Sequence, residues 1–118
     1  MRNYIKIDQG KVSIKVSVFI FKDGKSWVVY CPSLDLSGYD ITEEGAKKDF
    51  DWILQDWLNT QTSNKTLDED LKKHGWTADQ SKWSEPDFKE LLEKDHLMDS
   101  VMEKSHFVKT SIEVEAYC

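Results

Sequence analysis

The chain has 118 residues, of which 32% are charged, and a formal net charge of -6. This length suits one domain that can bury a core without disulfides or a structural metal. The acidic balance argues against unaided nucleic-acid binding, which needs a basic face, and it favours a basic partner.

Hydropathy and cysteine usage indicate a cytoplasmic protein. No apolar run is long enough to span a membrane, and the start of the chain lacks the apolar segment of a signal peptide. The two cysteines, Cys31 and Cys118, match no metal-ligand spacing. Cys31 lies in a hydrophobic strand pattern, where we expect a buried and inert thiol.

The first half of the sequence predicts a β-hairpin after a short extended segment at 3–8. Apolar residues alternate with others over 12–21, which is typical of a strand with one buried face. Asp23-Gly24 follows and is a strong signal for a two-residue turn into a second strand at 27–31. With the turn centred there, Ile20 would face Trp27 on the inner face of the sheet.

The same register predicts an apolar patch on the outer face, made by Phe19 and Val28 with Tyr30 beside them. A sheet that is buried on one side only does not need such a patch. Two interpretations stay open. The C-terminal half of the chain could fold over it, or it could be a protein interface.

A third strand and a helix follow. Pro32 ends regular pairing because it has no N–H, and 36–39 reads as a short strand with a bulge at Gly38. Thr42 is the expected N-cap of a helix over 43–59. Its core stripe is apolar at helical spacing and comprises Ala46, Phe50, Ile53, Leu54, Trp57 and Leu58.

Trp52 lies opposite this stripe, because each helical residue turns by about 100°. Either a later segment packs on Trp52, or it is an exposed anchor for a partner, flanked by Asp49 and Asp56.

The second half predicts short helices and a closing strand. Thr66 and Glu69 fit a capping box that opens a two-turn helix, which Gly75 ends. Residues 77–84 read as a loop pinned by Trp83, and Pro86 opens a further helix. The alternation over 107–117 predicts a strand whose inward row runs from Val108 through Thr110 and Ile112 to Ala116.

No pattern in the sequence supports catalysis. The three histidines have no ligand spacing, and no phosphate-binding loop, serine-hydrolase elbow or zinc-protease motif occurs. Two-metal chemistry in a sheet would require carboxylates on a central strand, and the strand at 12–21 holds none. We therefore expect no enzyme activity, no cofactor and no metal.

The stretch WVVYCPSLDLSGYDITEEGAKKDF resembles the HicB-like antitoxin family. The matching positions are Pro32, Leu34, Gly38, Thr42, Glu44 and Ala46, and the sequence departs from the family pattern at Asp40, Ile41 and Gly45. The segment TLDEDLKKHGW also looks like one found in a subset of the family.

The resemblance implies a single α+β domain over 1–118, with a core at 11–61 and a closing strand at 107–117. The order would be β-β-β-α-(α-α)-β, a partial RNase H-like sheet with a helix packed on one face and a helical insertion at 62–105. Family members bind a small basic HicA-type mRNA interferase and cover its active site.

We therefore predict an antitoxin-like protein that neutralises such a toxin, forms a homo-oligomer and does not itself bind nucleic acid or membrane. The predicted partner-binding residues are Trp52, Asp49, Asp56, Phe19, Val28 and Tyr30. A stand-alone homo-oligomeric binding module without a toxin is one alternative. A hydrolase whose site has no sequence signature is another.

Overall fold

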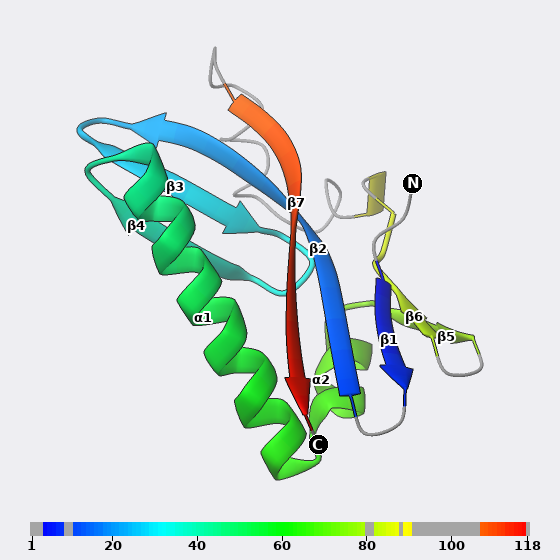
Figure 1. Ribbon diagram of the computed structural model, residues 1–118. Helices are drawn as coiled ribbons and strands as arrows, with labels where there is room; N and C mark the ends of the chain where they lie inside the picture. The colour runs from blue at the N-terminus through cyan, green and yellow to red at the C-terminus, as the bar shows by residue number, and fades with distance from the viewer. Residues whose placement is uncertain (1–3, 9–10, 80–81, 88, 91–106, 118) are drawn as a thin grey trace.

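The computed structural model describes residues 4–8, 11–79, 82–87, 89–90 and 107–117 (Figure 1). They form one α+β domain in which an antiparallel sheet carries a long helix on one face. The elements in chain order are β1 (Tyr4–Asp8), β2 (Lys11–Asp23), β3 (Ser26–Cys31), β4 (Leu36–Asp40), α1 (Glu43–Asn64), α2 (Leu67–Lys73), β5 (Thr77–Asp79), β6 (Lys82–Ser84) and β7 (Phe107–Tyr117).

Strand β2 is the centre of the sheet. Strand β7 pairs with one edge of β2 from Lys11 to Phe21. On the other edge, β1 pairs with residues 11–14 and β3 pairs with residues 19–23. Strand β4 extends the sheet beyond β3, while β6 and β5 extend it beyond β1. The sheet therefore forks, and no described strand covers residues 15–18 of β2 on this second edge.

The predicted hairpin forms, but the predicted register is wrong by two residues. Asp23 pairs with Ser26, and Ile20 pairs with Val29 rather than with Trp27. The turn residues are therefore Gly24 and Lys25, of which only Gly24 has a positive φ, at 63°. This is the arrangement of a type II′ turn, which places glycine first, whereas the prediction assumed a turn with Asp23 first. A shift by two keeps every side chain on its predicted face.

The core lies between β2 and α1. The alternate residues of β2 from Val12 to Ile20 are at most 3% exposed, and they contact an apolar stripe of the helix. In that stripe Ala46, Phe50, Leu54 and Leu58 are each fully buried. Burial of a large aliphatic or aromatic side chain contributes roughly 1.5–3 kcal/mol, so this seam is the main stabilising contact of the described fold.

Glycine at position 38 lets the helix approach the sheet closely. The β3–β4 register is continuous, with Val29 opposite Gly38, so the predicted bulge is absent. A Cβ at Gly38 would lie 2.6 Å from the backbone nitrogen of Phe50. The residue is therefore small because α1 crosses β4 at this point, and not because the strand is irregular.

The start of α1 is as predicted, but its end is not. The Thr42 hydroxyl accepts a hydrogen bond from the Gly45 N–H at 3.0 Å, as an N-cap should. The helix continues to Asn64, five residues beyond the predicted end, and stops at Lys65, whose φ is 57°. The predicted capping box at Thr66 is wrong, because the Thr66 hydroxyl donates to the Gln61 side chain at 2.6 Å and makes no cap bond.

Within the predicted loop at 77–84, the described residues form two antiparallel strands, β5 and β6, which pair with each other. Trp83, at 6% exposed, is packed in the core cluster, which agrees with the prediction that it pins this segment. The predicted helical insertion at 62–105 thus contains two strands as well as α2. The helix predicted from Pro86 and its apolar residues Phe88, Leu91 and Leu92 fall mostly outside the described residues.

Strand β7 has the predicted bounds, 107–117. Its predicted inward row is confirmed from Ile112 to Ala116, and the side chain of Val108 lies outside the described residues. Ala116 is buried, Ile112 and Val114 are half-buried against the core, and Thr110 is exposed. Thr110 therefore does not belong to the core row.

Candidate functional site

The outer face of α1 carries the most exposed tryptophan of the described chain. Trp52 is 68% exposed, so no later described segment packs on it. Asp56, one turn further along, is exposed, and Asp49 is half-buried one turn earlier. Residues three and four apart share a helix face, so the three predicted residues Trp52, Asp49 and Asp56 do come together.

Asp49 also connects α1 to β4, one of the edge strands of the sheet, through a hydrogen bond. Its Oδ2 accepts a hydrogen bond from the backbone N–H of Tyr39 at 2.9 Å. Tyr39 lies in β4, so this carboxylate occupies a backbone donor that would otherwise face solvent at the sheet edge. Asp49 is therefore a structural acceptor as well as a surface charge.

Gln55 connects the helix to β7, on the opposite edge of the sheet, through a hydrogen bond. Its Nε2 donates to the backbone carbonyl of Glu115 in β7 at 2.8 Å and to the Asn59 side chain at 3.1 Å. Trp52 lies between Asp49 and Gln55 in the sequence, and both of these flanking residues are bonded to strands. The indole is thus presented by a helix that is held at both outer strands. Sequence patterns did not predict this role of Gln55.

The carboxylates near this surface differ in their electrostatics. Partial desolvation raises the pKa of Asp51 above its usual value. The pKa of Asp40 is lowered, mainly because the Thr42 hydroxyl donates to its Oδ2 at 2.9 Å. Asp40 therefore stays ionised at the N-terminus of α1, where a negative charge interacts favourably with the helix dipole.

The second predicted set, Phe19, Val28 and Tyr30, does not lie on this surface. These side chains alternate with Val18, Ile20 and Val29, which contact α1, so they point to the opposite face of the sheet. They are 1%, 5% and 4% exposed respectively.

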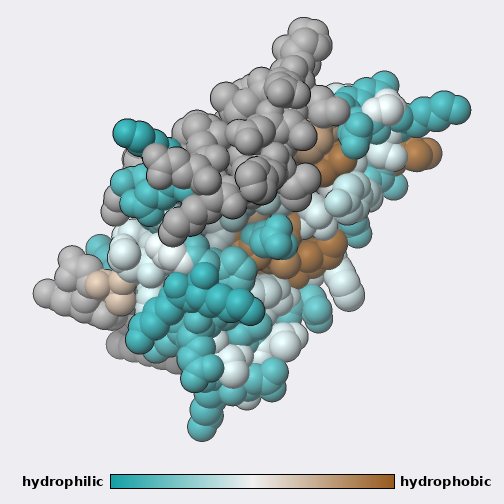
Figure 2. All heavy atoms as spheres, turned by 180° about the vertical axis from the view of Figure 1, so that it is seen from behind, coloured by the Kyte–Doolittle hydropathy of each residue, from teal (hydrophilic) through white to brown (hydrophobic). Residues whose placement is uncertain are grey.

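Figure 2, which views the molecule from behind, shows hydrophobic atoms on this side. Among the described residues of this sheet face, the exposed large hydrophobic side chain is that of Tyr39, at 58% exposed, which lies opposite Val28 in the β3–β4 register. The six predicted residues therefore form two separate groups, and only the group around Trp52 is open to a partner.

A buried polar cluster lies where the sheet forks, and no sequence pattern predicted it. Glu85 is 6% exposed and accepts three hydrogen bonds. The donors are the Ser17 N–H at 3.2 Å, the Ser17 hydroxyl at 3.0 Å and the Ser33 hydroxyl at 2.5 Å. The carboxylate thus occupies the stretch of β2 that lies between β1 and β3.

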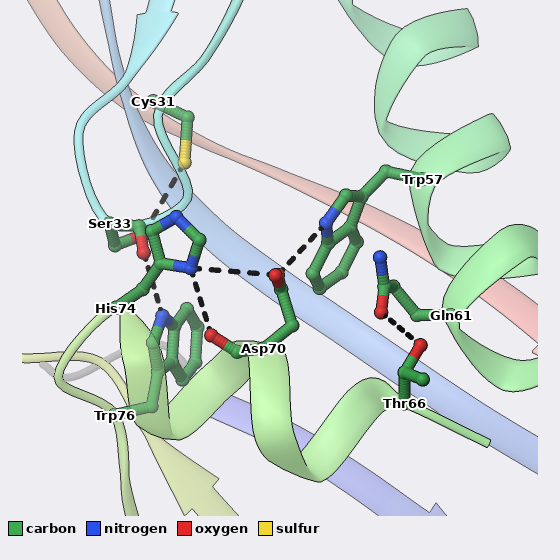
Figure 3. Close-up of polar contacts among 8 residues, drawn as sticks. All are labelled: Cys31, Ser33, Trp57, Gln61, Thr66, Asp70, His74 and Trp76. Atoms are coloured by element: carbon green, nitrogen blue, oxygen red, sulfur yellow. Dashed lines mark hydrogen bonds and ion pairs between the residues drawn. The ribbon is translucent and has the colours of Figure 1, made fainter. Parts of the chain in front are cut away.

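Cys31 lies beside this cluster and contacts Ser33. Its thiol is not placed to act as a nucleophile. Its Sγ lies 3.3 Å from the Ser33 Oγ, and Figure 3 draws this contact between the two side chains. Burial raises the pKa of the Cys31 thiol to about 12. Since the thiolate is the reactive form, a fully buried thiol with this pKa is inert at neutral pH, as the sequence predicted.

A second polar node joins the two helices. Asp70 of α2 accepts from the Trp57 indole N–H of α1 at 3.2 Å (Figure 3). The Nδ1 of His74 lies 2.8 Å from the Asp70 carbonyl oxygen and 3.5 Å from the Asp70 carboxylate. Trp76, which follows α2, donates its indole N–H to the Ser33 carbonyl at 2.9 Å. These contacts position α2 against α1 and the β3–β4 turn.

The described residues contain no group of three or more His, Cys, Asp and Glu side chains placed to hold a metal ion. Among the same residues, no helix is both long enough and apolar enough to cross a lipid bilayer.

Comparison with protein-family models, with curated proteins and with solved structures returned no match. The resemblance noted above therefore depends on the residues of the strand–turn–strand–helix segment.

Proposed function

We propose that this protein is a HicB-like antitoxin that binds a small basic HicA-type mRNA interferase and covers its active site. The observation that carries the proposal is the exposed indole of Trp52, which lies on a helix bonded to both outer strands, with Asp49 and Asp56 one turn away on either side. An exposed tryptophan on a rigid element is the type of residue that supplies most of the free energy of a protein–protein contact.

The residues shared with the family pattern support the proposal through the fold. Leu34 is 2% exposed and Ala46 is fully buried. Gly38 allows the close approach of α1, and Thr42 caps it. Each residue has a defined role in joining the β3–β4 hairpin to the helix. The order of β2, β3, β4 and α1 along the chain, with β7 closing the sheet, also supports the proposal, because the resemblance implies three strands, a helix and a closing strand.

Electrostatics support a basic partner. The chain has 22 acidic against 16 basic residues. Helix α1 places Asp51 and Asp56 on its exposed surface near Trp52. Carboxylates around an indole suit an arginine or lysine side chain, which can stack on the ring and pair with the acids. Such rim charges mainly raise the association rate, while the indole slows dissociation.

The test is to co-express the protein with the product of a neighbouring gene that encodes a short basic protein, and to measure the affinity of the purified pair by calorimetry. Trp52→Ala should weaken binding by about 30-fold or more, which corresponds to about 2 kcal/mol. Ile41→Ala is the matched control, because Ile41 is 77% exposed but lies outside α1.

RNA cleavage by the basic protein gives the functional readout. The wild-type chain and Ile41→Ala should suppress cleavage, and Trp52→Ala should fail at the same concentration. Equal affinity and equal protection by Trp52→Ala and the wild type would exclude the α1 surface as the binding site. Absence of binding by the wild type would exclude the antitoxin function itself.

The alternative of a stand-alone homo-oligomeric module is favoured by a different observation, the outer edge of β7, with which no described strand pairs.

A further inference from the structure

We propose that two copies of this chain pair through the outer edges of their β7 strands, so that two sheets join into one. This inference is independent of a toxin partner. It concerns the part of β7 from Thr110 to Ala116, which pairs with β2 along one edge and with no other described strand along the second edge.

Two hydrogen bonds establish which backbone groups of β7 point away from β2. Gln55 reaches the carbonyl of Glu115 from the outer side of the strand. On β2, the N–H of Ser17 points away from β7, toward Glu85, and Ser17 is the register partner of Ser111. In an antiparallel pair, the two residues that face each other direct their N–H and C=O groups either both inward or both outward. The backbone groups of Ser111, Glu113 and Glu115 are therefore directed outward.

This edge is less protected than the others in the described sheet. Strand β5 has three residues. Strand β4 has five, and Asp49 occupies its Tyr39 N–H. Strand β7 has eleven residues, and the described cap is Gln55 on Glu115 near its end. Long open edges with free N–H and C=O groups are templates for a further strand. The Gln55 cap leaves the outward groups of Ser111 and Glu113 for such pairing.

The side chains of β7 indicate which apolar surface would be buried when two β7 strands pair. On the α1 side, Ile112 and Val114 pack against the core but remain half exposed. On the other side, Ser111, Glu113 and Glu115 are exposed and polar. A strand laid along this edge would complete the burial of the apolar row and leave the polar row in solvent, as a two-faced sheet requires.

The charges on β7 favour one register for the pairing of two copies. A two-fold axis beside Ile112 places Ile112 opposite its counterpart, and it places Ser111 opposite Glu113 of the other copy. Roughly four backbone hydrogen bonds then form, from the outward groups of these residues. An axis beside Glu113 would place two carboxylates directly opposite each other, which is destabilising. The register on Ile112 avoids this contact and stacks two apolar side chains.

The first test exploits the outward direction of the Ser111 N–H. Ser111→Pro removes this donor and adds a ring at the open edge, while the pairing with β2 does not use the group. We expect the wild type to have the mass of a dimer by light scattering, and Ser111→Pro to have half that mass with an unchanged circular dichroism spectrum. Ser111→Ala, which keeps the N–H, is the matched control and should stay dimeric.

The second test does not depend on how well the proline variant folds. Opposed residues whose backbone groups face away from each other have Cα atoms about 4.5 Å apart, which is within disulfide range. In a Cys118→Ser background, Ile112→Cys should therefore form a covalent dimer on mild oxidation, whereas Thr110→Cys should not.

A wild-type chain that is monomeric at all concentrations would overturn the proposal. So would a dimer that persists in Ser111→Pro, or the absence of a crosslink through Ile112→Cys. Toxin binding by a monomeric Ser111→Pro variant would separate this interface from the surface around Trp52, so that failure of either proposal can be recognised without the other.

Discussion

The carboxylate of Glu85 accepts a hydrogen bond from the backbone N–H of Ser17, which lies 68 residues earlier in the chain. Strand β1 stops pairing with β2 at Ile14, and β3 starts at Phe19. Glu85 therefore supplies, from a side chain, the acceptor that a neighbouring strand would otherwise provide. It joins the two branches of the sheet at their fork.

The first prediction concerns this carboxylate. Glu85→Ala removes the acceptor of three hydrogen bonds, which come from the Ser17 N–H and from the hydroxyls of Ser17 and Ser33, and each such bond contributes about 1 kcal/mol. We expect a loss of roughly 3 kcal/mol in the free energy of unfolding, measured by urea denaturation. Glu85→Gln should lose less, because its amide oxygen still accepts. If Glu85→Ala cost less than Glu85→Gln, the carboxylate would not be the structural acceptor described here.

The second prediction is a double-mutant cycle at the start of α1. Gly→Ala within a helix usually stabilises by about 0.5–1 kcal/mol. Here a Cβ at Gly45 would collide with the Asp40 carboxylate, which would have to leave Thr42. Gly45→Ala should therefore be neutral or destabilising in the wild type, and it should be more favourable in an Asp40→Ala background. Identical effects in both backgrounds, measured by thermal unfolding, would contradict this coupling.

Gly38→Ala is the third prediction. The added methyl group would meet the backbone of Phe50 at 2.6–2.8 Å, and a helix backbone cannot move aside as a side chain can. Because overpacking in a close-packed interior costs about 1–3 kcal/mol, we expect a destabilisation in this range in urea. Gly24→Ala tests a different cause, since a Cβ there meets no atom within 4 Å but the φ of Gly24 is 63°.

The fourth prediction is a pH dependence. The pKa of the Cys31 thiol is raised from 9.0 to about 12 by burial. The unfolded chain therefore releases this proton above about pH 9, while the folded chain retains it. The stabilising contribution is complete below that pH and falls by about 1.4 kcal/mol for each further pH unit. Urea midpoints measured in alkaline buffers should fall more steeply for the wild type than for Cys31→Ala. Parallel profiles for the two proteins would show that the thiol does not titrate differently on folding.

Local patterns in the sequence predicted much of the fold. The alternation over 12–21, the Thr42 cap and the closing strand at 107–117 follow from periodicity and capping chemistry, which act between near neighbours. Trp52 was identified as lying opposite the core stripe by helical geometry alone.

Other features could not be read from local patterns. The polar residues 60–64 are helical, and the helix ends only where Lys65 adopts the left-handed conformation, which no local pattern marks. Gln61 diverts the Thr66 hydroxyl from the expected capping box. Glu85 has no periodic signal, because its partners lie in β2 and in the β3–β4 turn.

The candidate surface was predicted only in part for the same reason. Asp49, Trp52 and Asp56 share a helix face by spacing, so a sequence suffices to group them. The bonds from Asp49 to β4 and from Gln55 to β7 depend on where the helix crosses the sheet. The burial of Phe19, Val28 and Tyr30 depends on tertiary packing, which strand alternation does not report.

Fastening at both outer strands has a mechanical consequence for α1. A helix that rests on a sheet through apolar contacts alone can roll about its axis, since such contacts are weakly directional. Hydrogen bonds at Tyr39 and Glu115 oppose rotation in both senses. A protein that docks on Trp52 therefore meets a preformed target and loses little conformational entropy in doing so.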